Sequence, residues 1–296
     1  MLSGFIPLAL LTLVSGLPPE QQRTISPPRP TDVFLVAHED DWQLFMGDVV
    51  FKGVRRGNQS VLIYLTAGNE NTDANYWRAR ERAALQSTRL ATAVTDTGEV
   101  TCATVALLAR RIQRCAIANT VSYFLRLPDG RRDGAGFAHN AFQSLRKLHS
   151  TKVSAVSAVD TSTTYTSWTD LIATVEEIIR RERPGGSSVT VHANDPNAAI
   201  NPGDHSDHQM AGLVATAMRT KVSAEVIYYV GYALAARPDN RTRSQAGQKS
   251  ALFLAYDREM LIANRAWSTY SARPRFYSMC MLRTYARKVR ALPTAP

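Results

Sequence analysis

Two short clusters of acidic and imidazole side chains dominate the chemistry that this sequence can support. The first is AHEDD at residues 37–41, which directly follows an apolar run, and the second is GDHSDH at 203–208. A catalytic zinc ion takes three protein ligands, usually histidine and carboxylate, and keeps a fourth position for water. His38, Asp41 and His208 meet that count, because the first two lie on one turn and His208 starts a predicted helix. The two clusters together predict a hydrolytic zinc centre.

Each cluster has a simpler explanation when it is taken alone. An acidic pair such as Asp40 and Asp41 at the start of a helix is often only a cap that compensates the helix dipole. Asp204 is equally an ordinary N-cap, and His205 and His208 would then be surface residues. Because both clusters follow apolar strands, their joint occurrence is more specific for a metal site than either motif.

The alternation of apolar runs and amphipathic stretches indicates the fold class. Strands buried on both faces, with helices between them, are typical of a parallel sheet in an α/β fold. In such sheets ligands gather beyond the carboxyl ends of the strands, and His38 lies one residue past such an end. We therefore expect a Rossmann-like, mostly parallel sheet flanked by helices. The predicted strands are 33–37, 60–66, 121–125, 188–192 and 225–230, and the predicted helices are 42–52, 76–93, 167–183 and one from about 206.

Residues 99–127 depart from this alternation, because β-branched residues gather there without a helical period. We expect a β-hairpin insertion that leads into the strand at 121–125. In an exported chain Cys102 and Cys115 would pair across this hairpin and leave Cys280 free; the alternative is three small buried residues. After about residue 240 the sequence predicts helix and then irregular structure.

The N-terminus predicts export. The first seventeen residues carry no charge, and their apolar centre, LALLTLV at 8–14, is shorter than the roughly 20 residues of a membrane span and typical of a secretory signal. We expect a signal peptide at 1–17, a linker rich in Pro, Gln and Arg at 18–31, and a single domain over 32–296. The alternatives are an uncleaved N-terminal membrane anchor and a misassigned start.

Composition narrows the class of partner. The 296 residues, with 45% hydrophobic and 20% charged side chains, have the balance of a globular protein. A net charge of +10 favours acidic partners, such as a membrane surface or an anionic glycan. The basic residues are scattered in pairs, without a run of five or six and without a nucleic-acid-binding motif. We therefore expect no nucleic-acid partner.

The motifs, taken in order, resemble the LmbE/PIG-L family of zinc-dependent N-deacetylases, which act on N-acetylglucosamine-containing conjugates. That family opens with AHPDDE behind its first strand, and here AHEDDW stands at 37–42, with Glu39 for proline and Trp42 for glutamate. LTAG at 65–68 is similar to the family's second strand and glycine loop, RARE at 78–81 to its Arg-x-x-Glu helix, and HSDH at 205–208 to its closing His-x-x-His. The likeness covers residues 32–231.

The resemblance implies roles for single residues. His38, Asp41 and His208 would hold one zinc ion per chain, and Asp40 would be the general base that accepts a proton from water. A protonated His205 would stabilise the oxyanion and protonate the leaving amine.

Two further residues are candidate substrate contacts. The resemblance makes Arg78 a contact to a substrate hydroxyl or phosphate; the alternative is a helix-surface arginine paired with Glu81. Asp129, in LPDG at 127–130, ends a strand and could accept hydrogen bonds from sugar hydroxyls, although Pro-Asp-Gly is also an ordinary turn. His192 follows another strand, either as a support for the site or as the first loop residue.

The function that these predictions imply is removal of an N-acetyl group from an N-acetylglucosamine-containing or related amino-sugar conjugate, a small molecule or a glycoconjugate. Acetate and a free amine would be the products. One alternative is a zinc amidohydrolase acting on another acyl amide, such as a lipoglycopeptide or a cell-wall fragment. The other is a non-catalytic protein that binds glycans or polyanions. A binder has no use for Asp40 and His205 beside the three ligands, so their presence favours catalysis.

Overall fold

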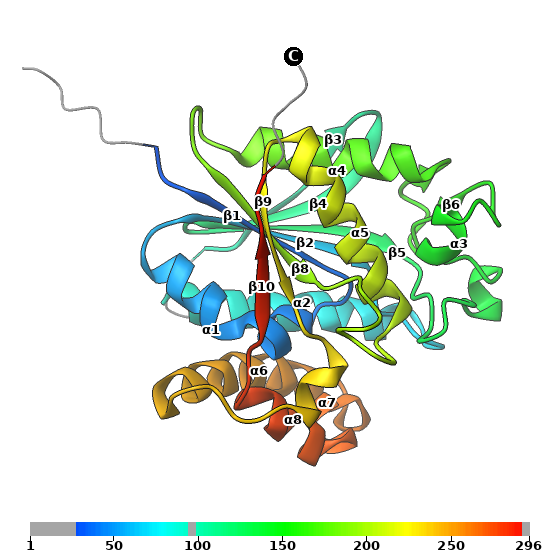
Figure 1. Cartoon of the computed structure of the whole chain (residues 1–296). Coiled ribbons are helices and arrows are strands. Elements are labelled where there is room, and N and C mark those ends of the chain that lie inside the picture. The colour runs from blue at the N-terminus through cyan, green and yellow to red at the C-terminus, as the bar shows by residue number, and fades with distance from the viewer. Residues whose placement is uncertain (1–27, 94–98, 292–296) are drawn as a thin grey trace, which may run out of the picture.

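A computed structural model describes residues 28–93 and 99–291 of the chain (Figure 1). The expected signal peptide and most of the expected linker lie outside these residues. The last linker residues, 28–30, are exposed, and the first strand, β1, begins at Thr31. Among the helices described, none combines the length and the apolar character that a membrane span needs.

An eight-stranded sheet forms the middle layer, in the order β10-β9-β8-β1-β2-β5-β4-β3. The five consecutive strands from β9 to β5 are parallel. The expected mostly parallel α/β sheet is therefore confirmed. The parallel strands are β1 (Thr31–Val36), β2 (Gln59–Thr66), β5 (Thr120–Leu127), β8 (Val189–Asn194) and β9 (Glu225–Tyr229).

Both faces of the parallel strands are buried, which explains their continuous apolar sequences. In β1, Val33 and Leu35 pack into a core beneath α4 and α5, whereas Phe34 and Val36 pack into a second core beneath α1, α2 and α6. Each such side chain contributes about 1.5–3 kcal/mol when it is removed from water. The helices are α1 (Asp41–Arg55), α2 (Ala74–Thr92), α4 (Trp168–Glu182), α5 (Ser206–Lys221) and α6 (Arg243–Ala263).

One edge of the sheet is the expected hairpin. Strands β3 (Thr101–Leu107) and β4 (Arg110–Ile117) are antiparallel to each other, and β4 is antiparallel to β5. Cys102 and Cys115 stand opposite each other in this pair and form a disulfide, and Cys280 is free and buried.

The other edge of the sheet differs from the sequence prediction, in which the strand at 225–230 completes the sheet. β9 does not complete the sheet, because β10 (Ala286–Val289) pairs antiparallel with it. Three of its four side chains are exposed, Arg287 and Lys288 among them. The apolar pattern that identifies a buried strand is therefore missing, as is common for charged edge strands.

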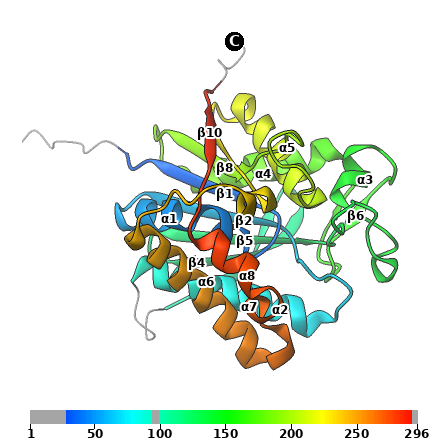
Figure 2. The same cartoon turned by 60° about the horizontal axis from the view of Figure 1, so that its bottom comes forward.

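The chain between α6 and β10 is also more regular than expected. Figure 2 shows this C-terminal segment beside α1 and α2. Lys249 fixes it to α6, because its buried Nζ donates to the carbonyl of Cys280 (2.8 Å), to Thr284 Oγ1 (3.1 Å) and to the carbonyl of Arg283. The remaining elements are η1 (Ala138–Asn140), α3 (Leu145–His149), β6 (Val156–Ser157), β7 (Thr164–Tyr165), η2 (Tyr232–Ala236), η3 (Arg265–Trp267), α7 (Thr269–Ala272) and α8 (Pro274–Met281).

Candidate metal centre

The parallel strands bring the two sequence clusters to one edge of the sheet. His38 follows β1, Asp129 follows β5, and the loop after β8 leads into α5, whose N-cap is His205. The ring centroids of His38 and His205 are 4.7 Å apart, and those of His38 and His208 are 5.3 Å apart. The imidazoles are buried, so the alternative of surface histidines is excluded.

His38, Asp41 and His208 form the first group of potential ligands. Nε2 of His208 lies 3.0 Å from Oδ1 of Asp41, and Nδ1 of His38 lies 3.5 Å from Oδ2 of the same carboxylate. This contact of His208 with Asp41 is an ion pair that lacks the geometry of a hydrogen bond. Nitrogen and oxygen atoms that lie this close together could bind one metal ion between them.

Hydrogen bonds hold these ligands from behind. Oδ2 of Asp41 accepts from the backbone N–H groups of Ala37 (3.1 Å) and His38 (2.8 Å). Nδ1 of His208 lies 2.9 Å from Oδ1 of Asp204, and Asp204 also accepts from the N–H of Tyr232. A carboxylate behind a histidine is the usual way to orient a metal ligand. The sequence predicted Asp204 only as a possible N-cap, although its position four residues before His208 was the available signal.

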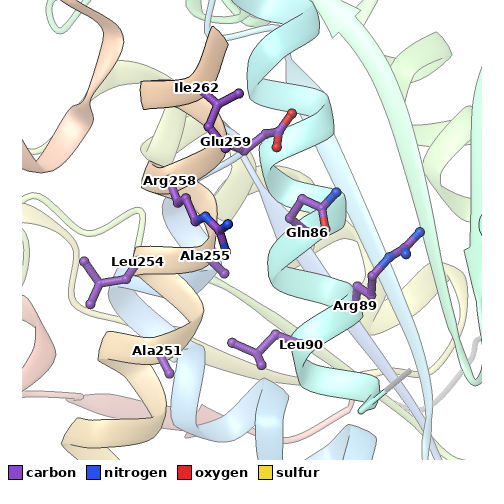
Figure 3. Close-up of a pocket in the computed structure, with 9 residues that line it drawn as sticks. All are labelled: Gln86, Arg89, Leu90, Ala251, Leu254, Ala255, Arg258, Glu259 and Ile262. Atoms are coloured by element: carbon purple, nitrogen blue, oxygen red, sulfur yellow. The ribbon is translucent and has the colours of Figure 1, made fainter. Parts of the chain in front are cut away.

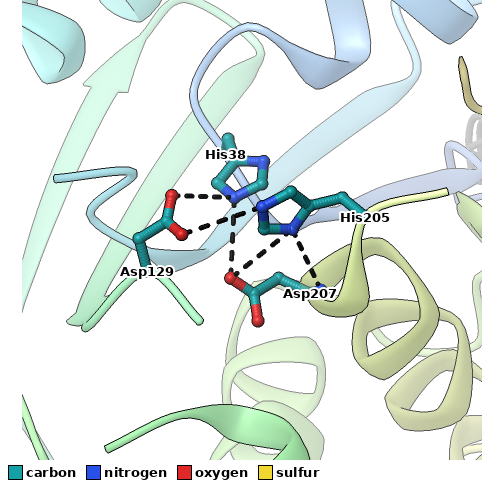
Figure 4. Close-up of side chains that lie close together, drawn as sticks. All are labelled: His38, Asp129, His205 and Asp207. Atoms are coloured by element: carbon teal, nitrogen blue, oxygen red, sulfur yellow. Dashed lines mark hydrogen bonds and ion pairs between the residues drawn. The ribbon is translucent and has the colours of Figure 1, made fainter. Parts of the chain in front are cut away.

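A second group, His38, Asp129, His205 and Asp207, adjoins the first (Figure 4). Nε2 of His38 lies 3.5 Å from Asp129 and 3.6 Å from Asp207. Nδ1 of His205 accepts from the backbone N–H of Asp207 (3.2 Å), so the neutral ring carries its hydrogen on Nε2. This ring then has no lone pair to offer, and the first group is the better metal site. Asp207 was not predicted as a site residue, although it stands inside the His-x-x-His motif.

The electrostatics of both groups favour positive charge. Burial alone would lower the pKa of His38, but the carboxylates of Asp41 and Asp207 raise it well above its usual value. In the same way Asp41 and Asp204, working against burial, raise the pKa of His208 to about 10. Protons and a divalent cation compete for the same ligand atoms. The residues present therefore fit a metal ion in charge, donor type and burial.

His205 behaves differently from the other two imidazoles. Burial, and then the positive charge of His38, lower its pKa to about 3. This favours a neutral His205 that donates through Nε2 over the protonated ring that the family resemblance implies.

Asp40 lies beside this group and is held by a buried arginine. Nη2 of Arg80 donates to Asp40 Oδ1 at 2.5 Å, and Nε donates to Glu39 Oε2 at 2.9 Å. Glu39, which stands where the family has proline, therefore has a partner. Gly68 makes room for the guanidinium: its φ is +50°, and a Cβ there would lie 2.8 Å from Arg80 Cζ. These contacts explain the glycine loop that the sequence showed.

The two candidate substrate contacts have different places. Asp129 lies in the site and also makes the turn, because its Oδ1 accepts from the N–H of Arg131 (2.7 Å). Arg78 is exposed, lies over the Trp77 ring at 4.9 Å, and is not among the residues that line the cavity described below. The arginine of this helix that does line the cavity is Arg80.

His192 lies away from the group as part of the core. Its ring stacks on Phe34 with centroids 4.5 Å apart, and its Nδ1 lies 2.8 Å from the hydroxyl of Tyr229. The sequence predicted His192 either as a support for the site or as the first loop residue. The structure instead shows it packed in the core.

A cavity of about 590 Å³ opens above this site, within the range of about 300–1,000 Å³ for small-molecule sites. His38, Asp40, Asp129 and His205 line its inner end. Asp41 and His208 are buried beneath it. The other lining residues are Glu70, Thr72, Tyr76, Arg80, Arg131, Arg132, Phe137, Tyr232, Ala266, Trp267, Ser268, Thr269, Ala272, Arg273 and Tyr277.

A second hollow, of about 540 Å³, lies between α2 and α6 (Figure 3). Leucine, isoleucine and alanine side chains alternate there with Gln86, Arg89, Arg258 and Glu259. It contains no histidine or cysteine and only one carboxylate. The side chains that could hold a metal ion therefore gather at the first cavity and not here.

Comparison with known proteins gives one family match. The family model PIG-L, described as GlcNAc-PI de-N-acetylase, matches residues 33–218. No curated protein matches the sequence.

The chain is similar to several solved structures, three of which are described here. One is the N,N'-diacetylchitobiose deacetylase from Pyrococcus horikoshii, with 14% identity, a TM-score of 0.47, and coverage of 88% of this chain and 84% of that chain. The second is a conserved protein from Thermus thermophilus, with 16% identity, a TM-score of 0.44, and coverage of 90% and 97%. The third is the zinc-inhibited form of a teicoplanin deacetylase, with 12% identity, a TM-score of 0.44, and coverage of 78% and 85%. These structural likenesses are too distant to assign a family. The family model matches more than half of the chain, and the assignment rests on that match.

Proposed function

Because the chain belongs to the PIG-L family of de-N-acetylases, we propose that it is a zinc-dependent hydrolase that removes the N-acetyl group from an amino-sugar conjugate. The observation that carries the proposal is the convergence of His38, Asp41 and His208 next to Asp40 at the inner end of one cavity. A metal site alone would serve many functions. A partnered carboxylate and a neutral imidazole beside it are the additional groups that amide hydrolysis needs.

Asp40 and the three candidate ligands have separate parts in the activation of water. His38, Asp41 and His208 would hold a zinc ion, which would supply a Lewis acid and lower the pKa of water toward about 7. Asp40 accepts the proton from the attacking water. Arg80 binds one of its oxygens, Oδ1, and keeps the carboxylate in place, while the other oxygen is left for the proton. The water oxygen forms a bond to the acetyl carbon.

His205 and Asp40 complete the reaction. The Nε2–H of His205 donates to the acetyl oxygen as negative charge develops there, a contact worth roughly 2.7–4 kcal/mol in comparable oxyanion sites. Asp207 fixes this tautomer through its backbone N–H. Asp40 then passes its proton to the amine nitrogen while the C–N bond breaks. Acetate and the free amine leave, and the proton balance closes without a protonated His205.

Acetate release from a panel of N-acetylated amino sugars tests the proposal. The zinc-loaded wild-type protein is expected to release acetate, and Asp40→Asn to be slower by about 10²- to 10⁴-fold with its zinc content unchanged. Asp239→Asn, an exposed aspartate far along the chain, is the matched control and retains full activity. An inert wild-type protein across the panel, or an Asp40→Asn variant as active as the control, would refute the mechanism.

We also infer that the chain is exported. The disulfide between Cys102 and Cys115 supports this, because such bonds persist in oxidising compartments. The apolar segment at 1–17 supports it from the sequence. N-terminal sequencing of the protein from fractionated producing cells is expected to find a start near residue 18 outside the cytoplasm. Full-length chain in the cytoplasmic fraction contradicts export, and full-length chain in the membrane fraction identifies an uncleaved anchor.

A further inference from the structure

One wall of the cavity comes from a part of the chain that the family match does not reach. The match ends at residue 218, whereas Trp267, Arg273 and Tyr277 line the same cavity as Asp40. We call residues 264–277, which comprise η3, α7 and the start of α8, the outer wall. Two of its aromatic side chains, Trp267 and Tyr277, are half-buried and line the cavity.

A chain of contacts links the outer wall to Asp40. Arg80, which binds Asp40, also donates from Nη1 to the hydroxyl of Tyr76 at 3.5 Å. The ring of Tyr76 meets the ring of Trp267 edge to face, with centroids 5.4 Å apart and planes at 80°. Only the side chain of Tyr76 therefore lies between Trp267 and Arg80, the residue that binds Asp40.

The position of Trp267 is fixed by its surroundings. With Tyr76 it packs on a small core between α2 and α6, formed by Ala79, Ala83, Tyr256 and Met260. The next turn is anchored to α6, because Asp257 accepts from Ser268 Oγ and from the N–H of Tyr270, both at 2.9 Å. An aromatic surface held in this way loses little conformational entropy when a ligand binds.

We propose that Trp267, with Tyr76 packed against it and Tyr277 on the same wall of the cavity, is a ring-stacking subsite for the sugar attached to the N-acetylated residue. The proposal rests on the function proposed above and names the class of conjugate, one with a second pyranose ring. A pyranose ring has an apolar face of C–H groups and hydroxyls at its rim. Aromatic rings match the face, and polar side chains at the cavity surface match the rim.

The polar neighbours of Trp267 favour a sugar over an acyl chain as the occupant. Thr269 and Arg273 line the cavity on the same wall, and Glu70 lines it from the loop before α2. A hydrocarbon chain would leave these groups without water or partners, at a cost in free energy. A second sugar offers each of them a hydroxyl.

Steady-state kinetics with two substrates tests the subsite. N-acetylglucosamine occupies only the inner end, whereas N,N'-diacetylchitobiose also places a ring on Trp267. Trp267→Ala is expected to lower kcat/KM for the disaccharide about tenfold more than for the monosaccharide, mainly through KM. Trp267→Phe keeps a ring and recovers most of the loss. Phe142→Ala, an exposed aromatic outside the cavity, leaves the ratio of the two values unchanged.

A binding measurement separates failure of the subsite from failure of the proposed function. N,N'-diacetylchitobiose is added to the Asp40→Asn protein, and its tryptophan emission is expected to change. In the double variant that carries both Asp40→Asn and Trp267→Phe, the same addition is expected to cause no change. If Trp267→Ala lowers both kcat/KM values equally, the subsite is refuted and the deacetylase stands. If no substrate releases acetate, the deacetylase is refuted, and the emission change alone decides the subsite. No emission change, or one that survives Trp267→Phe, refutes the subsite.

Discussion

The two ends of the cavity are built in different ways. At the inner end the candidate ligand side chains are buried, with His208 0% and Asp41 2% exposed, and hydrogen bonds back these two. At the outer wall Trp267 and Tyr277 are half-buried, and the carboxylate of Asp257 anchors the neighbouring residues Ser268 and Tyr270. A buried charge needs every partner in place, whereas an aromatic surface tolerates exchange. The chemistry is therefore fixed at one end, and the choice of substrate is free to vary at the other.

The largest expected effect follows from replacing Arg80, the buried arginine at the inner end of the cavity. Arg80→Met leaves the buried carboxylates of Glu39 and Asp40 without a partner. The free energy of unfolding is expected to fall by about 3–5 kcal/mol, measured by urea denaturation. Arg78→Met, two residues earlier and exposed, is the matched control and changes stability by less than about 0.5 kcal/mol. Equal stability of the two variants would show that the inner end does not depend on full pairing.

The support behind the ligands is expected to matter next. Asp204→Ala removes the carboxylate 2.9 Å from Nδ1 of His208. The zinc affinity is expected to fall about 10- to 100-fold, measured by competition with a chromophoric chelator. Asp133→Ala, an exposed aspartate near the cavity mouth, is the control. If the affinity of Asp204→Ala stays within about twofold of the control, the carboxylate behind His208 is not needed for metal binding.

The free energy of unfolding is expected to depend on pH through Lys249, which holds the C-terminal segment to α6. Burial lowers the pKa of Lys249 to about 8 from its ordinary value of 10.5. Between these values the unfolded chain binds the proton that the folded chain has lost, so the stability contributed by Lys249 rises with pH. The stability of wild type relative to Lys249→Met is expected to rise by roughly 2 kcal/mol from about pH 8 to about pH 10, measured by urea denaturation. A difference that stays flat or falls would mean that Lys249 remains charged in the fold.

The smallest expected effect separates the two ends directly. Asp257→Asn weakens the anchor of Ser268 and Tyr270, at about 1 kcal/mol. Amide exchange at Tyr270 is expected to accelerate, and the preference for the disaccharide to fall, while the zinc affinity is unchanged. Zinc loss in Asp257→Asn would show that the two ends are coupled.

Much of the sheet and of the inner end was predictable from sequence, because local rules govern them. Apolar runs buried on both faces identify parallel strands, and the helix expected at 167–183 is observed as Trp168–Glu182, with Ser167 as its cap. Parallel topology then brings the ends of β1, β5 and β8 together. This is why two remote motifs predicted one site.

The rest depends on tertiary packing that no spacing rule encodes. Arg80, not Arg78, faces the cavity because of a rotation of α2 that the motif alone does not define. The N–H of Asp207 that bonds to His205 is a backbone group, and any residue type except proline offers it. Trp267 reaches the cavity only because α6 packs on α2. β10 was missed because its exposed charges carry no buried pattern.

Zinc content of two histidine variants tests the central claim most directly. His208→Ala removes a ligand of the first group, and His205→Ala removes a member of the neighbouring group only. After reconstitution and dialysis, we predict one zinc ion per chain in the wild type and in His205→Ala, and almost none in His208→Ala. A His208→Ala protein that keeps its zinc while His205→Ala loses it would place the ion among His38, Asp129 and Asp207 and contradict the account.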